Sequence, residues 1–387
     1  MNTMSTDRAR GALLGLAVGD ALGTTYEFEH LEQPAYPALA TGPATDVVGQ
    51  GPFRLAAGQI TDDTQLAVCL ARSLADRRAL DPADLAARYV AWAAHAFDIG
   101  NQTNAAISRL EAGEPPHTAG LTVWRATERR PAGNGSLMRT APIGVAFADR
   151  GAHAVVDAAI ADSLITHADP RCLLACAAFD AAIAAAVRPG VARALLGTTA
   201  GAAHGPVDVA STQAGFGAAA LAAAQAELGA AAPLDGRGLV AAAQVGLELG
   251  AAALRAAWTD ADDVAALEAA VEALAGDLAA ASAADPCVYG DGLHLQRTAG
   301  FVRVAFRLAF WHAVHTPSWR DAVVDVASRG GDADTNTAIA GALLGARDGE
   351  AAIPEAWRLR VLAATQPGPA DWAEAHHPRH LLAVCDR

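Results

Sequence analysis

The stretch that decides the fold is GALLGLAVGDALG, residues 11–23. It carries a glycine at every fourth residue, at Gly11, Gly15, Gly19 and Gly23. Residues four apart lie on the same face of an α-helix, so this spacing predicts a helix with a ridge of glycines along one side. Glycine weakens a helix, but a ridge without side chains lets a second backbone come close. We therefore expect this helix to lie at the centre of the protein rather than on its surface.

The composition extends the helical prediction to the rest of the chain. The 387 residues are 52% hydrophobic and 18% charged, which excludes wholesale disorder, and only 5% are aromatic. Alanine is abundant and is the best helix former, whereas strands favour β-branched and aromatic residues. Apolar residues also recur at helical spacing, as in Leu66, Leu70 and Leu74. We expect an all-α protein.

No clear domain boundary interrupts the sequence, so we expect a single domain over residues 1–387. Residues from about 191 to 284 are very rich in alanine and glycine but have no fixed repeat period. We interpret this segment as small-residue helices that elaborate the core.

The charge and the cysteines limit the partners and the compartment. Lys and Arg number 28 and Asp and Glu 42, so the formal net charge is −14, and no basic run stands out. A nucleic-acid groove is not expected, because binding to phosphates needs a positive face. The apolar stretches end too early to span a membrane, and the first residues lack an apolar signal core. Five cysteines are sparse and odd in number, which indicates a reducing compartment. We expect a cytoplasmic protein.

Two distant segments combine paired carboxylates with hydroxyls. QITDDT, residues 59–64, precedes a helical pattern that starts at Gln65, and SRGGDADTNT, residues 328–337, precedes a small-residue helix from Ala338. Each segment alone is explained by helix capping, because Asp and Thr are favoured where a helix begins. The match between the two segments, and the Gly330-Gly331 turn in the second, favour a shared site.

If the two segments meet in the fold, four carboxylates share a small space. Their mutual repulsion amounts to several kcal/mol, which protons or cations must relieve. Two divalent cations would balance four negative charges. The donors are carboxylate and hydroxyl oxygens without cysteine, which suits Mg²⁺ or Mn²⁺. The sequence thus predicts a pair of such ions, able to bind substrate hydroxyls and activate water.

The sequence also resembles the ADP-ribosylglycohydrolase family, which includes the dinitrogenase reductase-activating glycohydrolases and the ADP-ribosyl-acceptor hydrolases. The resemblance runs from about residue 10 to residue 345. It rests on motifs that occur in the family's order: GALLGLAVGDALG (11–23), YE (26–27), TDDT (61–64), DIGN (98–101), GNGSLMR (133–139), TH (166–167), GFV (300–302) and GGDADT (330–335).

The resemblance implies a fold and a metal centre. The fold would be a compact, orthogonal bundle of helices around a dinuclear metal site. The implied metal ligands are Thr61, Asp62, Asp63, Asp332, Asp334 and Thr335. This set agrees with the charge argument above, although for each threonine helix capping is the competing role.

The resemblance also implies two catalytic carboxylates, Glu27 and Asp98. By itself Glu27 could be an exposed surface acid, as we expect for Glu29 and Glu32, and Asp98 could be the cap of a helix end. In the family an Asp-Ile-Gly segment like that at Asp98 accompanies activity on ADP-ribosyl-arginine rather than ADP-ribosyl-serine.

A third implied group binds the substrate: Gly133, Asn134, Gly135 and Ser136 in one loop, together with His167. A plain turn is the default explanation of the loop, and the alternative has its backbone N–H groups on a diphosphate or ribose. His167 could equally be a buried, hydrogen-bonded histidine. Asp20 could orient a ligand or cap the next turn, and Arg139 could pair with phosphate or form a structural ion pair.

The implied function is the metal-dependent hydrolysis of the N-glycosidic bond between ADP-ribose and a protein side chain, most of all arginine. The partners would be an ADP-ribosylated protein, ADP-ribose and, in one variant, an ADP-ribosyltransferase. Two alternatives stay open. One is a protein that binds ADP-ribose or blocks a transferase without turnover, and the other is a hydrolase of a different ADP-ribose derivative.

Overall fold

The computed structural model describes residues 5–188 and 234–385, and within these ranges it contains helices and isolated β-bridges but no strand. The all-α prediction is therefore confirmed for the described residues. The helices are α1 (Thr6–Gly23), α2 (Asp62–Arg77), α3 (Pro82–Ala93), α4 (Asn101–Glu111), α5 (Pro116–Ala126), α6 (Ala141–Ala146), α7 (Ala152–Thr166), α8 (Pro170–Val187), α11 (Gly236–Ala257), α12 (Ala261–Ala280), α13 (Val302–His315), α14 (Trp319–Ser328), α15 (Ala333–Asp348), α16 (Glu355–Ala363) and α17 (Ala370–Ala375).

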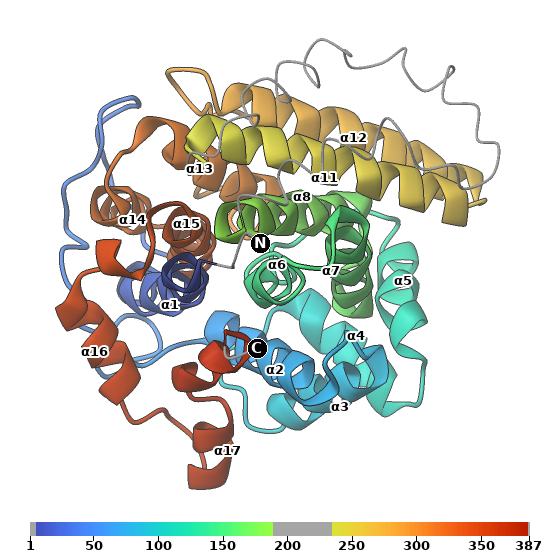
Figure 1. Cartoon of the computed structure of the whole chain (residues 1–387), viewed down its shortest axis with the longest axis horizontal. Helices are drawn as coiled ribbons and strands as arrows, with labels where there is room; N and C mark the ends of the chain where they lie inside the picture. Colours follow the sequence, from blue (N-terminus) through green and yellow to red (C-terminus); the bar gives the residue numbers. More distant parts are fainter. Residues whose placement is uncertain (1–4, 189–233, 386–387) are drawn as a thin grey trace.

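The glycine ridge of α1 packs directly against the backbone of α15, as Figure 1 shows. A Cβ atom added at Gly11 would lie 2.3 Å from the carbonyl oxygen of Gly345, and one added at Gly23 would lie 2.3 Å from that of Ala333. The two helices are thus antiparallel and in backbone contact along their whole length. The prediction of a central first helix is confirmed, and the end of α1 lies beside the start of α15.

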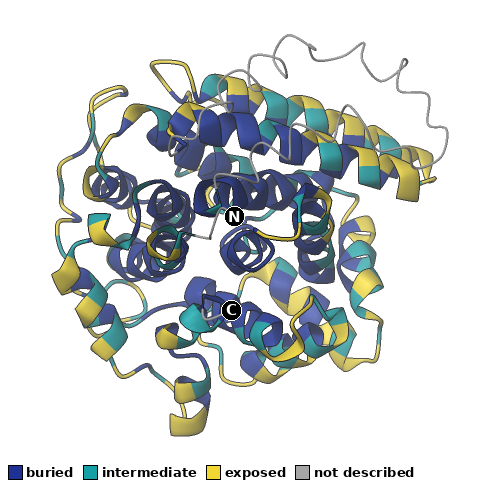
Figure 2. Cartoon of the chain, viewed as in Figure 1, coloured by how far each residue is buried: buried dark blue, intermediate teal, exposed yellow. Residues whose placement is uncertain are grey.

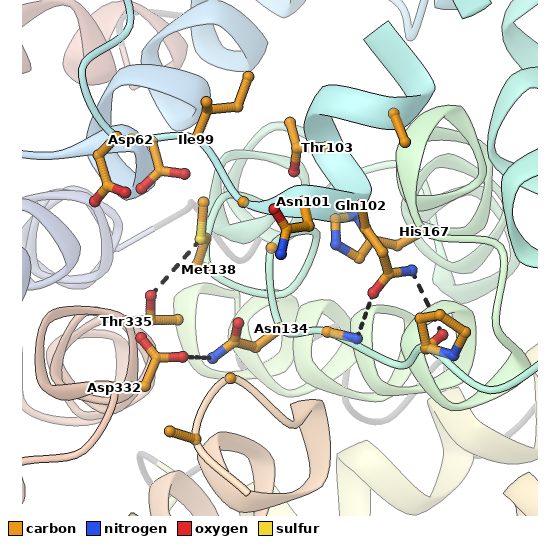
Figure 3. A pocket seen from close by; sticks show the side chains of 18 of the residues that line it. Asp62, Ile99, Asn101, Gln102, Thr103, Asn134, Met138, His167, Asp332 and Thr335 are labelled. Carbon is orange, nitrogen blue, oxygen red and sulfur yellow. Dashed lines mark hydrogen bonds between the residues drawn. The ribbon is translucent and has the colours of Figure 1, made fainter. Parts of the chain in front are cut away.

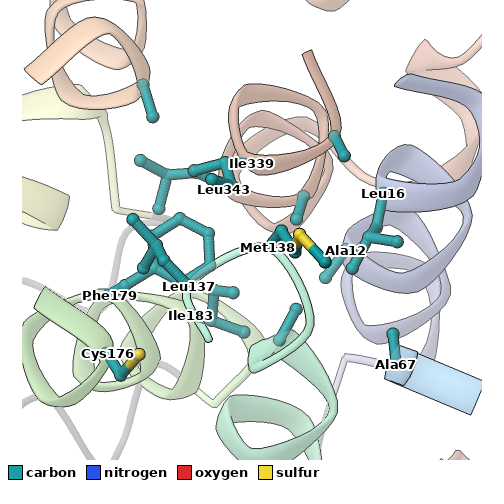
Figure 4. Packing of buried hydrophobic residues seen from close by; sticks show 14 of the residues in the cluster. Ala12, Leu16, Ala67, Leu137, Met138, Cys176, Phe179, Ile183, Ile339 and Leu343 are labelled. Carbon is teal, nitrogen blue, oxygen red and sulfur yellow. The ribbon is translucent and has the colours of Figure 1, made fainter. Parts of the chain in front are cut away.

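Several helices pack directly on this pair, among them α8, α13 and α14, and others form an outer layer. Helices α13 and α14 pack on α15, and α8 packs on α7 and α11 (Figure 1). Buried residues concentrate in α1, α8 and α15, whereas α12 and α16 expose one side (Figure 2). Figure 4 shows part of the core, where Leu137 and Met138 lie near side chains of α1, α8 and α15.

The alanine-rich segment 191–284 is described only from residue 234 onward, and residues 191–233 lie outside the described part. From there it forms α11 and α12, and α11 packs on α8. Both α8 and α11 are long and apolar enough to pass as membrane spans, with mean hydropathies of 1.6 and 1.3. In α8, however, 94% of that window is buried among other helices, as in the core helix of a globular fold.

Two helices begin earlier than the sequence pattern suggested. Helix α2 begins at Asp62 rather than at Gln65, and α15 begins at Ala333 rather than at Ala338. The acidic residues therefore occupy the first helical turns, where backbone N–H groups and the helix dipole favour negative charge.

Candidate active site

The two acidic segments meet at the place where α1, α2 and α15 come together. The hydroxyl of Thr61 lies 3.2 Å from Asp63 Oδ2 and 3.3 Å from Asp334 Oδ2, although 273 residues separate Thr61 from Asp334. The hydroxyl of Thr335 lies 3.4 Å from Asp63 Oδ2. Residues from both segments therefore share one small volume.

Asp20, near the end of α1, holds the start of α2. Its carboxylate accepts hydrogen bonds from the backbone N–H groups of Thr61 and Thr64 at 3.1–3.2 Å and from both of their hydroxyls at 2.9 and 2.5 Å. Asp20 thus caps α2 from a different helix, and it also accepts the hydroxyl of Thr24, one turn further along its own chain, at 3.3 Å. It couples the glycine-packed pair of helices to the TDDT segment.

Glu27 performs the same task for α15. Its Oε2 atom accepts the N–H of Ala333 at 2.5 Å and that of Asp334 at 3.2 Å. The N-cap residue Asp332 makes no capping bond of its own. Glu27 is only 4% exposed, so it is not a surface acid, whereas Glu29 and Glu32 are exposed as expected.

The threonines are not occupied as helix caps. Thr61 is the N-cap residue of α2, yet its side chain makes no capping bond to that helix. Its hydroxyl has three carboxylate oxygens within 3.3 Å, from Asp20, Asp63 and Asp334, but only one proton to donate. One proton cannot satisfy all three oxygens, and a cation between them would relieve this arrangement.

The electrostatics of the cluster agree with this geometry. Burial raises the pKa values of Asp62, Asp63 and Asp334 well above the usual carboxyl value, and the neighbouring carboxylates raise them further. Asp63 Oδ1 is buried without a hydrogen-bond partner. Two sets of three carboxylates have oxygens within 4.8 Å of one another, Asp20 with Asp63 and Asp334, and Glu27 with Asp332 and Asp334. Oxygen donors of this number and kind fit two hard divalent cations.

A cavity of about 690 Å³ opens beside this cluster (Figure 3). Asp62, Asp332 and Thr335 lie at one end, and Gln102 and His167 lie at the other. Of the predicted site residues, ten line the cavity: Glu27, Asp62, Asp98, Gly133, Asn134, Gly135, His167, Asp332, Asp334 and Thr335. Thr61 and Asp63 are fully buried behind them.

Asp98 lies in the loop between α3 and α4, half-buried on the cavity wall. Burial raises its pKa to about 7, and the charges of Asp20 and Asp332 add to the shift. A carboxyl group in this range can exchange a proton near neutral pH.

The glycine loop is fixed by side chains from other segments. Gln102 Oε1 accepts the N–H of Gly133 at 2.8 Å, and the N–H of Asn134 bonds to the carbonyl of Gly300 at 3.0 Å. These two N–H groups are therefore already used and do not remain for a phosphate, contrary to the expected role of the whole loop. The amide of Asn134 instead donates to Asp332 Oδ2 at 2.7 Å and orients that carboxylate.

Ser136 and Arg139 point away from the cavity. The hydroxyl of Ser136 is buried and accepts a hydrogen bond from Ser163 at 2.8 Å, so its side chain does not line the substrate space. Arg139 is fully buried and pairs with Asp162 at 3.1 Å, which makes it a structural ion pair rather than a phosphate ligand.

The hydrogen-bond partners of His167 favour one tautomer. Its Nδ1 lies 2.8 Å from the hydroxyl of Thr166, and that hydroxyl accepts a bond from Arg139 at 2.9 Å. Because a guanidinium only donates, the threonine proton is left for Nδ1, and we assign the histidine proton to Nε2. Burial lowers the pKa of His167 to about 3, so the ring is neutral. Nε2 faces the loop closely, since a Cβ added at Gly135 would lie 3.0 Å from it.

The sequence did not single out Phe28, Gln102 and Thr103, which also line the cavity. Their closeness in sequence to predicted site residues could have pointed to them, because Phe28 follows Glu27, and Gln102 and Thr103 follow the Asp98 segment.

Comparison with known proteins gives several relatives. ADP-ribosylarginine hydrolase Tri1 of Pseudomonas putida (strain GB-1) is 42% identical over 154 residues, which cover 36% of this chain and 36% of that protein. Tri1 of Serratia proteamaculans (strain 568) is 34% identical over 180 residues, 44% of this chain and 45% of the relative. The ADP-ribosyl-[dinitrogen reductase] glycohydrolase of Rhodospirillum rubrum is 39% identical over 172 residues, 44% and 54% of the two chains. This chain thus spans about half or less of these relatives.

The fold comparison covers much more of the chain. A solved structure described as an ADP-ribosylglycohydrolase-related protein complex matches 99% of this chain and 98% of its own, with a TM-score of 0.60 and 26% identity. The family model for ADP-ribosylglycohydrolase matches residues 1–384. With the acidic cluster and the all-α fold already established, we conclude that the chain belongs to the ADP-ribosylglycohydrolase family.

Proposed function

We propose that this protein is a metal-dependent hydrolase that removes ADP-ribose from ADP-ribosyl-arginine on modified proteins. The observation that carries the proposal is the meeting of the two acidic segments at one end of a cavity, where the hydroxyl of Thr61 faces three carboxylates. The relatives named as ADP-ribosylarginine hydrolases support arginine as the acceptor.

Two divalent cations, Mg²⁺ or Mn²⁺, would be held by oxygens of the acidic segments. The proposed ligands are Thr61, Asp62, Asp63, Asp332, Asp334 and Thr335. When bound, such ions supply Lewis-acid contacts to ribose hydroxyls and lower the pKa of a coordinated water.

The geometry favours Asp98 over Glu27 as the group that takes the proton of the attacking water. Glu27 Oε2 is occupied by two backbone N–H groups of α15, and the residue is buried. Asp98 stands half-buried on the cavity wall, and among the described residues no hydrogen bond to its carboxylate is found. Cations bound beside Asp332 would lower the pKa of Asp98 from about 7 and so favour the carboxylate that accepts a proton. Glu27 then serves to position Asp334 and the first turn of α15.

The nucleotide would occupy the other end of the cavity, between Gln102 and His167 (Figure 3). There the Nε2–H of His167 offers a donor to an acceptor oxygen, and Val123 and Pro131 provide apolar wall. We further propose a cytoplasmic location, supported by the small and odd number of cysteines, five in 387 residues.

The test is to incubate the protein with arginine-ADP-ribosylated and serine-ADP-ribosylated proteins, with and without a chelator, and to measure released ADP-ribose. We expect metal-dependent release from arginine. Asp334→Ala should lose metal binding and turnover together, whereas Asp98→Asn should retain metal and lose turnover. Glu29→Gln, at an exposed acid two residues from Glu27, is the matched control and should behave as wild type.

Each outcome discriminates among the candidate functions. Wild-type turnover by Asp98→Asn would remove Asp98 from the proton-transfer role. Stoichiometric inhibition of an ADP-ribosyltransferase that survives Asp334→Ala would favour the blocking partner, and release from O-acetyl-ADP-ribose alone would favour a different hydrolase.

A further inference from the structure

Three phenylalanine rings from distant segments gather beside the acidic end of the cavity. Phe28 and Phe53 have ring centroids 6.3 Å apart, and Phe53 and Phe97 have centroids 5.7 Å apart, both with the edge of one ring toward the face of the other. Phe28 is 69% exposed and Phe97 is 39% exposed. We call these three residues the aromatic rim. Large apolar side chains left this open to water mark a surface that binds something.

The aromatic rim adjoins the candidate active site through Phe28 and through Phe97. Phe28 directly follows Glu27 and lines the cavity, while Phe97 directly precedes Asp98, which also lines it. Ile99, which follows Asp98, also lines the cavity, and Figure 3 draws it at the same end of the cavity as Asp62. The aromatic rim is therefore adjacent in sequence to both carboxylates that the family resemblance marks as catalytic.

Phe28 is held there at a conformational cost. Its φ of 61° lies in the left-handed region, which bulky residues rarely adopt. Two backbone hydrogen bonds fix this conformation. The N–H of Phe28 donates to the carbonyl oxygen of Gly331 at 2.7 Å, and the N–H of Gly331 donates to the carbonyl oxygen of Glu29 at 2.9 Å. Strain that the surrounding structure enforces is typical of functional positions.

The direction of the substrate follows from the proposed function, on which this inference rests. With the ribose at the acidic cluster and the nucleotide toward Gln102 and His167, the modified side chain must leave the cavity at the acidic end. That exit is bordered by Glu27 and Asp98, which are acidic, and by Phe28, which is aromatic.

The geometry points to the aromatic rim as the part of the site that recognises the guanidinium of the modified arginine, with Phe28 in direct contact. A guanidinium is planar, weakly hydrated and positive, so it stacks on aromatic faces and is attracted by nearby carboxylates. Phe53 supports the ring of Phe28 through an edge-to-face contact, and Phe97 supports Phe53 in the same way. An adduct on serine offers no cation to this surface, so the rim selects arginine.

The experiment compares Phe28→Leu with Phe28→Tyr in the hydrolysis of an ADP-ribosyl-arginine peptide. The leucine variant keeps apolar bulk but loses the ring, and the tyrosine variant keeps the ring. We expect Phe28→Leu to raise KM for the peptide roughly threefold to tenfold. The inhibition constant of free ADP-ribose, which lacks the guanidinium, should stay within about twofold, because its contacts lie deeper in the cavity. Phe28→Tyr should retain the wild-type KM.

Leu359→Ala, at an exposed leucine of α16, controls for the loss of surface apolar area and should change neither constant. Equal weakening of peptide and ADP-ribose by Phe28→Leu, or no change in either, would overturn the role of the rim while leaving the hydrolase intact. Absence of turnover by the wild-type protein with metal would overturn the proposed function and this inference together.

Discussion

The backbone contact between α1 and α15 can be tested by adding one methyl group, in Gly15→Ala. The new Cβ would lie 2.2 Å from the carbonyl oxygen of Gly341, whereas ordinary contact begins at 3.4 Å. The shortfall is 3.4 − 2.2 = 1.2 Å, and both atoms are fixed to helical backbone, so no side chain can turn aside. The two helices must move apart along a fully buried seam.

The expected cost follows from two opposing terms. Overpacking a core typically costs about 1–3 kcal/mol, and a gap of this size between backbones belongs at the upper end. Replacing glycine by alanine in a helix returns roughly 0.5–1 kcal/mol. We expect Gly15→Ala to lower the free energy of unfolding by about 2 kcal/mol. Since Asp20 and Asp334 lie on the two separated helices, Mg²⁺ binding should weaken as well.

The assay is urea unfolding of the metal-free proteins followed by circular dichroism, with Mg²⁺ titration by calorimetry. Gly276→Ala is the matched control, because Gly276 lies in exposed α12 and an added Cβ meets no atom within 4 Å. The control should be stabilised by roughly 0.5–1 kcal/mol. A Gly15→Ala protein as stable as Gly276→Ala would refute the close packing of α1 on α15.

Three further results are expected. Asp334→Asn should stabilise the metal-free protein, because it removes a buried charge that its neighbours repel. It should also lower Mg²⁺ affinity by more than roughly 10- to 100-fold, the cost of losing a residue that only hydrogen-bonds to a metal ligand. Equal Mg²⁺ affinity of mutant and wild type in calorimetry would contradict this. Burial raises the pKa of Asp98 to about 7. The metal-free protein should therefore become more stable in thermal melts as pH falls from about 7 toward the usual carboxyl pKa, and saturating Mg²⁺ should remove that gain. Thr166→Val should remove the hydrogen bond at Nδ1 of His167, visible as a shift of its ¹⁵N resonance, and weaken ADP-ribose binding roughly threefold to tenfold. An unchanged Nδ1 resonance would contradict the bond between Thr166 and His167.

Much of the fold could be predicted because its signals are local and periodic. The four-residue spacing of glycines in residues 11–23 predicts a central helix, since only a close backbone neighbour compensates for so many glycines. The pairing partner was not predicted, because α15 is more than 300 residues away and nothing in the spacing of α1 selects it. The helix starts at Asp62 and Ala333 were also missed, because in a sequence acidic residues in the first turn of a helix cannot be told from acidic residues just before the helix.

The residue types of the site could be predicted from the sequence, but the contacts among those residues could not. The similarity of TDDT and GGDADT favours a shared site, and if the two segments meet, their like charges demand cations. That Asp20 and Glu27 each cap another helix depends on how α1 is placed against α2 and α15, which only the packed structure decides. The same holds for Ser136, which a turn of the backbone points inward, and for Phe28, Phe53 and Phe97, which only tertiary packing brings into one row. A linear pattern encodes chemistry and helical faces, whereas the direction of a side chain across a packed interface is fixed by its neighbours in space.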